Sequence, residues 1–179
     1  KATDYLRGKG YNAFDLANEF GQRKEALNPV EHLAKGKSIR YAEDAPYSDS
    51  YKAGGNGALV DGVCGGWTYT DNKWQGFIRN GIDVTIDLGE EKEITEVSAQ
   101  FMQMCIPDVW FPAEVIISTS CDGRGFRGVA RIEHTVARDE GLSFKEYGWK
   151  GNAKARYINY RAKCGPQRGW LFTDEIVVR

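Results

Sequence analysis

The sequence has few of the residues that mark common functional classes. It holds two histidines and four cysteines in 179 residues, and no cysteine spacing resembles a CxxC zinc-ligand set. It has no apolar run near the roughly 18 residues that a membrane-spanning helix needs. The 24 basic residues nearly balance the 25 acidic ones and are scattered along the chain. We therefore expect a globular domain with no zinc site, no membrane insertion and no nucleic-acid partner.

Recognisable catalytic motifs are also missing. Neither His32 nor His134 lies in a nucleophile motif such as G-x-S-x-G, and no glycine loop followed by a helix could cradle a phosphate. Asp108 and Glu114 could be drawn as a glycosidase carboxylate pair, but sequence cannot place them across a cleft. We expect no catalytic residues.

The cysteines leave the redox state open. Three full pairings are possible, and we expect buried free thiols. If the protein is secreted, Cys64 with Cys105 is the first candidate pair, because both fall in predicted loops. The chain begins at Lys1 without a signal peptide, so we expect a fragment of a longer precursor.

Residues 1–32 lack the short alternating runs of the rest of the sequence. The stretch 12–27 opens with Asn12 as a helix N-cap and places apolar residues on one helical face, and Asn28-Pro29 ends it. We expect a short helical arm here, with a partly ordered linker as the alternative.

Residues 33–179 show the short alternating runs of an antiparallel all-β fold. Strands are predicted at 83–89, 92–103, 113–120, 155–163 and 170–179, with the charged segment "GEEK" as a turn between the first two and Asp122-Gly123 as a hairpin turn. Ile158, Tyr160 and Ala162 should face inward, as should Ile176 and Val178. The pattern favours a jelly-roll β-sandwich over a barrel.

Five motifs in order carry a family resemblance, namely "ALVDGVCGGWTYTDNKWQGF", "VTIDLGEEKEITEV", "WFPAEVIISTSCDGRGF", "ARYINYRAK" and "WLFTDEIVV". They resemble the discoidin or coagulation factor 5/8 type C domain, in the bacterial version classed with family 32 carbohydrate-binding modules. They are most similar to the C-terminal domain of Bacteroidetes chitobiases, the family 20 β-N-acetylhexosaminidases. The resemblance implies a galactose-binding-like jelly roll over residues 33–179, with "HLAKGKSIRY" as its first strand.

The resemblance also implies a structural calcium ion. On the family pattern Asp61 and Glu175 give side-chain oxygens, and Leu59 and Val63 give carbonyls. Related loops often place Thr or Ser where this chain has Cys64 and two glycines, which removes one oxygen ligand. The alternative is that Asp61 caps a turn and Glu175 is an edge-strand acid.

Aromatic residues outside the strand pattern are candidates for sugar contact. Trp67, Tyr69 and Trp110 lie in irregular loops, and a pyranose ring can stack its apolar face on an aromatic ring. Gln167 and Arg168 could bond hydroxyl groups, and loop packing is the alternative for all five. By contrast, Trp74 and Phe77 should be buried, and Trp170 should pack in the last strand.

The main hypothesis is a non-catalytic carbohydrate-binding domain of a secreted or surface-bound bacterial glycan-degrading enzyme resembling chitobiase. It would be extracellular, periplasmic or on the cell surface, a monomer, and would bind galactose- or N-acetylhexosamine-type sugars weakly beside its catalytic domain. The alternative is a structural or protein-interaction domain of the same enzyme without a sugar site.

Overall fold

The computed structural model describes residues 29–134 and 141–179, and within them the chain is almost entirely antiparallel β-structure. The predicted helix at 12–27 lies outside these residues. Seven strands and two short 3₁₀ helices follow in the order β1 Ser38–Tyr41, η1 Asp49–Tyr51, η2 Ala58–Val60, β2 Gln75–Ile78, β3 Ile82–Gln103, β4 Glu114–Ser120, β5 Arg127–Glu133, β6 Ser143–Lys163 and β7 Trp170–Val178. None of the described helices is long and apolar enough to cross a membrane.

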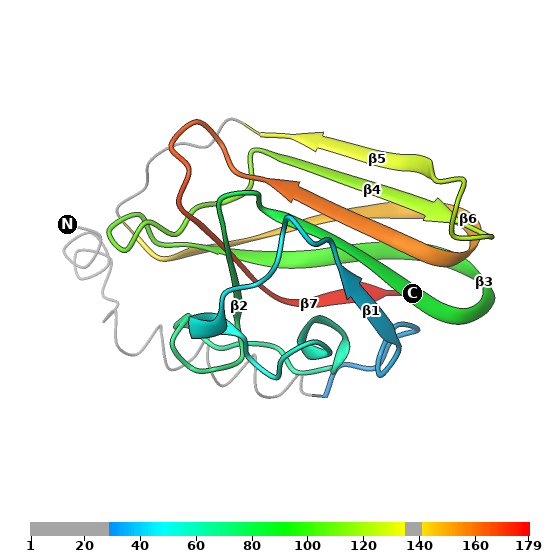
Figure 1. Cartoon of the computed structure of the whole chain (residues 1–179), viewed down its shortest axis with the longest axis horizontal. Helices are drawn as coiled ribbons and strands as arrows, with labels where there is room; N and C mark the ends of the chain where they lie inside the picture. Colours follow the sequence, from blue (N-terminus) through cyan, green and yellow to red (C-terminus); the bar gives the residue numbers. More distant parts are fainter. Residues whose placement is uncertain (1–28, 135–140) are drawn as a thin grey trace, which may run out of the picture.

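Two long bent strands, β3 and β6, run through both layers of the sandwich (Figure 1). The first part of β3, Ile82–Asp87, pairs with the end of β6 and also with β1. The second part, Lys92–Gln103, pairs with the start of β6 and also with β7. The strand order is β2-β7-β3-β6-β4-β5, with β1 added beside β3. Bending these two strands therefore folds one connected sheet into a jelly-roll sandwich.

The core lies between the two layers and draws on both parts of β3. Its fully buried residues include Val84, Ile86 and Leu88 before the bend and Ile94, Val97 and Phe101 after it. Alternation of side chains places every second residue inward before the bend and again from Val97 to Phe101, and the register shift between Ile94 and Glu96 accounts for the three-residue step from Ile94 to Val97.

The strand predictions are largely confirmed. Ile158, Tyr160 and Ala162 are buried, as are Ile176 and Val178. Trp74 and Phe77 are buried as expected, and the Asp122-Gly123 turn joins β4 to β5 with Gly123 at φ +77°. The prediction of a turn at "GEEK" was wrong: β3 continues through it, with a register shift between Asp87 and Lys92 and with Gly89 at φ +87°. The charged residues mark the bend of one strand.

The described cysteines form no disulfide. Cys105 is a free buried thiol, so the Cys64–Cys105 disulfide considered from the sequence is not formed. Cys121 and Cys164 are also free, and burial raises the pKa of the Cys164 thiol.

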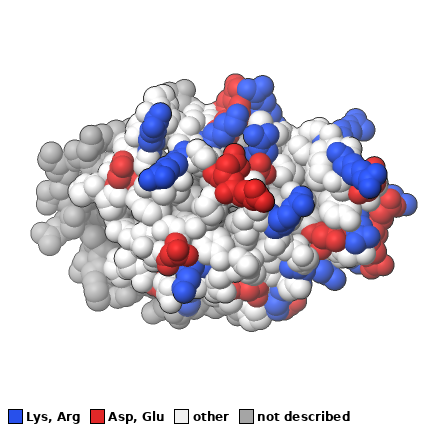
Figure 2. Space-filling model, in the orientation of Figure 1, with Lys and Arg blue, Asp and Glu red and all other residues white. Residues whose placement is uncertain are grey.

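Basic and acidic side chains are interspersed on the face drawn in Figure 2. No extended basic patch of the kind that binds nucleic acid is visible on this face.

Candidate functional site

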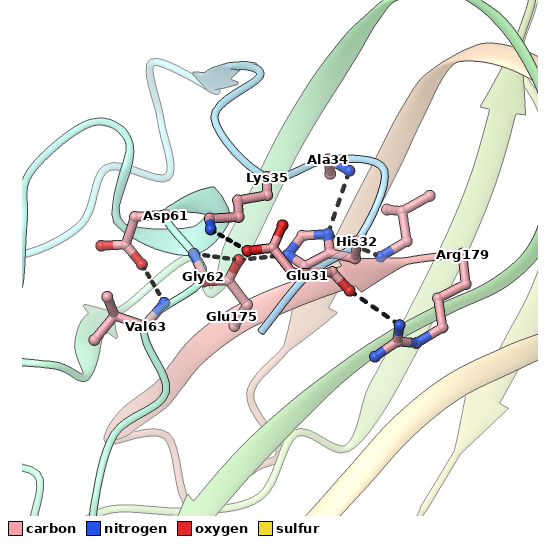
Figure 3. A network of polar contacts seen from close by, with 10 residues as sticks. Glu31, His32, Ala34, Lys35, Asp61, Gly62, Val63, Glu175 and Arg179 are labelled. Atoms are coloured by element: carbon pink, nitrogen blue, oxygen red, sulfur yellow. Dashed lines mark hydrogen bonds and ion pairs between the residues drawn. The ribbon is translucent and has the colours of Figure 1, made fainter. Parts of the chain in front are cut away.

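Glu175 of β7 is the centre of a buried polar network (Figure 3). Its side chain is almost fully buried, and its Oε1 accepts hydrogen bonds from the backbone N–H of Gly62, at 3.0 Å, and from Nε2 of His32, at 2.7 Å. The Asp61-Gly62 loop and the last strand thus meet, as the proposed ion site requires. The Oδ1 of Asp61 accepts from the N–H of Val63, at 2.8 Å.

The tautomer of His32 follows from its neighbours. Its Nδ1 accepts hydrogen bonds from the N–H groups of Ala34, at 3.2 Å, and Val178, at 3.3 Å. Nε2 must therefore carry the proton and donate it to Glu175. Burial, reinforced by the charge of Arg179, lowers the pKa of His32 to about 4. The ring is neutral near pH 7, and its three bonds tie the segment before β1 to the last strand.

The carboxyl of Glu175 holds its proton more tightly than an exposed glutamate does. Burial raises its pKa to about 9, and the nearby carboxylates of Asp61 and Asp174 act in the same direction. Its Oε2 is buried and makes no hydrogen bond of ordinary length, and the Asp61 carboxyl lies close enough to share a proton with Glu175. Such a group is stabilised either by a proton or by a cation beside Oε2.

These residues fit a hard cation in part. The buried Glu175 Oε2 and the carboxylate of Asp61 are oxygen donors of the type that calcium prefers. No cluster of three or more His, Cys, Asp or Glu side chains with metal-binding geometry occurs in residues 29–134 and 141–179. The remaining ligands would therefore be carbonyls such as those of Leu59 and Val63, which flank Asp61.

Gln75 is a buried polar residue that the sequence did not single out. Its Nε2 donates to the carbonyls of Lys52 and Gly55, both at 3.0 Å, and its Oε1 accepts from the hydroxyl of Tyr41, at 2.6 Å. Burial raises the pKa of Tyr41, so the hydroxyl keeps its proton and donates. Gln75 thus holds the loop before η2 against β2. A polar residue on the predicted buried face of "KWQGF" was the only signal for it.

The loops proposed for sugar binding meet at one end of the sandwich. Val109 forms a parallel bridge with Trp170, and the N–H of Trp110 donates to the Trp170 carbonyl, at 2.9 Å. The loop that holds Tyr69 reaches the same end through Tyr51. The ring centroid of Tyr51 lies 5.2 Å from that of Trp170 and 5.7 Å from that of Tyr69. We call this region, formed by residues 66–73, 104–113 and 164–170, the loop end.

The three aromatic candidates differ in exposure. Trp67 is 40% exposed, whereas Trp110 is only 8% exposed and its Nε1 donates to Asp108 Oδ1, at 2.6 Å. Tyr69 is half-buried and packs against Phe172, with ring centroids 5.2 Å apart. Only Trp67 among the three offers an open ring.

The two polar candidates lie in the loop between β6 and β7. Arg168 is exposed and has φ +56°. Gln167 is half-buried, and its Nε2 is a buried donor without a partner among the described residues. The loop is tight, since a Cβ on the following Gly169 would lie 2.7 Å from the carbonyl oxygen of Asp108.

Comparison with known proteins identifies the fold. No protein-family model and no curated protein sequence matches the chain. Among solved structures, CBM32-1 from a family 31 glycoside hydrolase of Clostridium perfringens superposes with a TM-score of 0.57 at 16% identity, covering 84% of this chain and 99% of that one.

Two further structures agree with it. CpGH89CBM32-5 from Clostridium perfringens, in complex with GalNAc-β-1,3-galactose, gives a TM-score of 0.54 at 18% identity, covering 83% of this chain and 99% of that one. The CBM32 of AlyQ, in complex with 4,5-unsaturated mannuronic acid, gives a TM-score of 0.54 at 15% identity, covering 83% of this chain and 98% of that one. The chain therefore has the jelly-roll sandwich fold seen in family 32 carbohydrate-binding modules.

Proposed function

We propose that the chain is a non-catalytic carbohydrate-binding domain that accompanies a glycan-degrading enzyme. The proposal draws on the fold, since two structurally similar modules were solved with saccharides. It places the domain outside the cytoplasm or on the cell surface of a bacterium, as a monomer tethered to a hexosaminidase-type catalytic domain. The preferred ligands are galactose- or N-acetylhexosamine-type sugars.

The exposed ring of Trp67 at the loop end carries the proposal. A pyranose would stack its C–H face on this ring while donors of Gln167 and Arg168 bond its hydroxyl groups. The Nε2 of Gln167 is buried and would meet a hydroxyl only if the side chain turned outward, whereas Arg168 is already exposed. One open aromatic ring supports only weak binding, and a millimolar dissociation constant corresponds to about −4 kcal/mol. Tethering to a catalytic domain would raise the effective sugar concentration.

The same proposal includes a structural calcium ion beside Glu175. Asp61 and the Oε2 of Glu175 would supply charge, and the carbonyls of Leu59 and Val63 would complete part of the shell. When bound, the ion would neutralise the two carboxylates. The chain itself already orients Glu175 through the bonds from Gly62 and His32.

A titration on the full chain tests the sugar site. Methyl glycosides of galactose, N-acetylgalactosamine and N-acetylglucosamine are added while the indole N–H signals are followed by NMR. We expect the Trp67 signal to shift and Trp67→Ala to abolish the response. A folded chain that leaves all indole signals unmoved across this panel would refute the sugar site.

A protein-interaction domain of the same enzyme is the second candidate. Its supporting observation is that Tyr69 and Trp110 pack against the domain's own residues, which partly fills the loop end. Binding of the separately expressed catalytic domain, weakened by Trp67→Ala and unaffected by free sugars, would favour this candidate.

A further inference from the structure

We propose a second saccharide site, for a pyranose bearing a carboxylate, at the end of the sandwich opposite the loop end. A hollow of about 630 Å³ lies there between the β4–β5 turn and the bend of β6. Residues that line it include Asp122, Arg127, Val129, Trp149, Asn152 and Lys154. We call it the bend hollow. It contains none of the residues assigned to the loop end or to the ion site.

Its position follows from the strand directions. β4 begins at Glu114, beside the loop end, and finishes at Ser120, which lines the bend hollow. In Figure 1 the β4–β5 turn and the bends of β3 and β6 share one end of the sandwich. The hollow is therefore the mouth between the two layers at that end.

Trp149 gives this hollow an aromatic wall. It pairs with Val97 of β3, is half-buried and packs against the edge of the core. A Cβ at Gly151 would lie 2.5 Å from the Cζ2 of Trp149, so any larger residue there would displace the indole. An indole held against the backbone and open to a cavity is a rigid stacking surface for a pyranose face.

The rim supplies donors that the protein does not use. The side chains of Arg127 and Asn152 form no hydrogen bond or ion pair within the described part of the chain. The side chain of Lys154 makes an exposed ion pair with Glu91, at 3.4 Å. The guanidinium of Arg127 and the amide of Asn152 beside one indole suit a ligand with hydroxyl groups and one negative charge, since a guanidinium can bind a carboxylate through two parallel hydrogen bonds.

Two acids lie at the hollow, Glu91, which pairs with Lys154, and Asp122, which is held in the β4–β5 turn. Asp122 Oδ1 accepts from Ser120 Oγ and from the N–H groups of Arg124 and Gly125, at 2.8–3.0 Å. These bonds lower the pKa of Asp122 and engage its Oδ1 in the turn. Asp122 therefore stays charged but is held in the turn, and Lys154 is paired with Glu91, so the guanidinium of Arg127 is the lining cation that remains for a ligand carboxylate.

The test compares two ligands and two arginines. Methyl β-glucuronide and methyl β-glucoside differ only in the carboxylate, and they are titrated into the full chain with the indole N–H of Trp149 observed by NMR. Arg127→Gln removes the proposed carboxylate contact. Arg124→Gln, in the turn just before β5 and outside the hollow, is the matched control. Both arginines are exposed, so neither change should disturb folding.

We expect the glucuronide to shift the Trp149 signal and Arg127→Gln to weaken binding at least about tenfold, because it removes a charged hydrogen-bond donor from the carboxylate. Arg124→Gln should leave binding unchanged. No shift with saturating glucuronide, or equal binding of both glycosides, would overturn the proposal. So would loss of the response in Trp67→Ala, because the ligand would then be at the loop end. Since the neutral-sugar test reads Trp67 and this one reads Trp149, either site can fail without the other.

Discussion

His32 and Glu175, which are 143 residues apart in the chain, are joined by a 2.7 Å hydrogen bond in the interior of the protein. The segment that precedes β1 is thereby fastened to the last strand. Two backbone hydrogen bonds also hold this segment, both at 2.8 Å. The N–H of Leu33 donates to the Val178 carbonyl in the last strand, and the N–H of Val30 donates to the Gly62 carbonyl in the Asp61-Gly62 loop.

Replacing His32 should destabilise the fold. His32→Ala leaves the N–H groups of Ala34 and Val178 without their acceptor and Glu175 Oε1 without one donor. We expect the free energy of unfolding to fall by about 2–3 kcal/mol, measured by urea denaturation. His134→Ala is the control, since His134 is half-exposed and follows β5; equal losses in both variants would contradict the role of His32.

Calcium should raise the melting temperature of the full chain. An ion at a hundredfold excess over its dissociation constant adds about 2.7 kcal/mol to stability. Glu175→Gln should abolish the calcium effect while keeping the bonds from Gly62 and His32, because the amide oxygen can still accept. If calcium stabilises both forms equally, the ion lies elsewhere.

The pH dependence of folding stability should differ with and without calcium. With a chelator, the raised pKa of Glu175 makes the folded state bind its proton more tightly than the unfolded state, so its contribution to stability declines between pH 4.5 and about 9. The lowered pKa of His32 has the opposite sign and lowers stability as pH falls from 6.5 to about 4.

Below pH 6.5 the two effects therefore oppose each other, and above it only the decline from Glu175 remains. We expect the melting temperature in chelator to fall from pH 6.5 to about 9 and to recover on adding calcium. Glu175→Gln should flatten the fall, and a fall that persists in this variant would assign it to another group.

Gly65 should tolerate no side chain. A Cβ there would lie 2.2 Å from Nε1 of Trp74, which is fully buried and donates to the Gly66 carbonyl. Gly65→Ala should lower stability by about 1–3 kcal/mol in denaturant titrations. Gly57→Ala is the matched control, because a Cβ at Gly57 meets nothing within 4 Å and its φ is −97°. Similar stability of the two variants would count against the close packing at Trp74.

Trp110→Ala should destabilise the fold far more than Trp67→Ala, because Trp110 is buried and Trp67 is partly exposed. Trp110→Ala removes a buried ring and its bond to Asp108, so we expect a loss of about 3–5 kcal/mol. Trp67→Ala removes a ring that is 40% exposed and should change stability much less. Thermal melts of both variants give the comparison, and a large loss in Trp67→Ala would mean that its ring supports the loop.

The strands could be predicted because their patterns are local. Alternation at Val84, Ile86 and Leu88 fixes the buried face wherever the strand pairs. The bend at Gly89 could not be distinguished from a turn, since a glycine with charged neighbours suits both, and only the pairing of β6 on either side decides it.

The site residues illustrate the limit of sequence reasoning. The family resemblance predicted that Asp61 and Glu175 lie near each other, and in the structure the N–H of Gly62, next to Asp61, donates to Glu175. His32 and Gln75 were missed because a buried histidine or glutamine is recognised by its distant partners, which sequence alone does not place. Burial of Trp110 likewise depends on its contact with the Trp170 strand.

The sharing of β3 and β6 between both layers has a consequence for folding kinetics. Neither layer is complete without these strands, so the layers cannot unfold independently, and a single cooperative transition is expected. β3 must also find β6 across the whole β4–β5 hairpin, with Ile82 meeting Ala162. Contacts so distant in sequence slow the search for the native state. The domain should therefore refold slowly, on the millisecond-to-second scale of other all-β proteins.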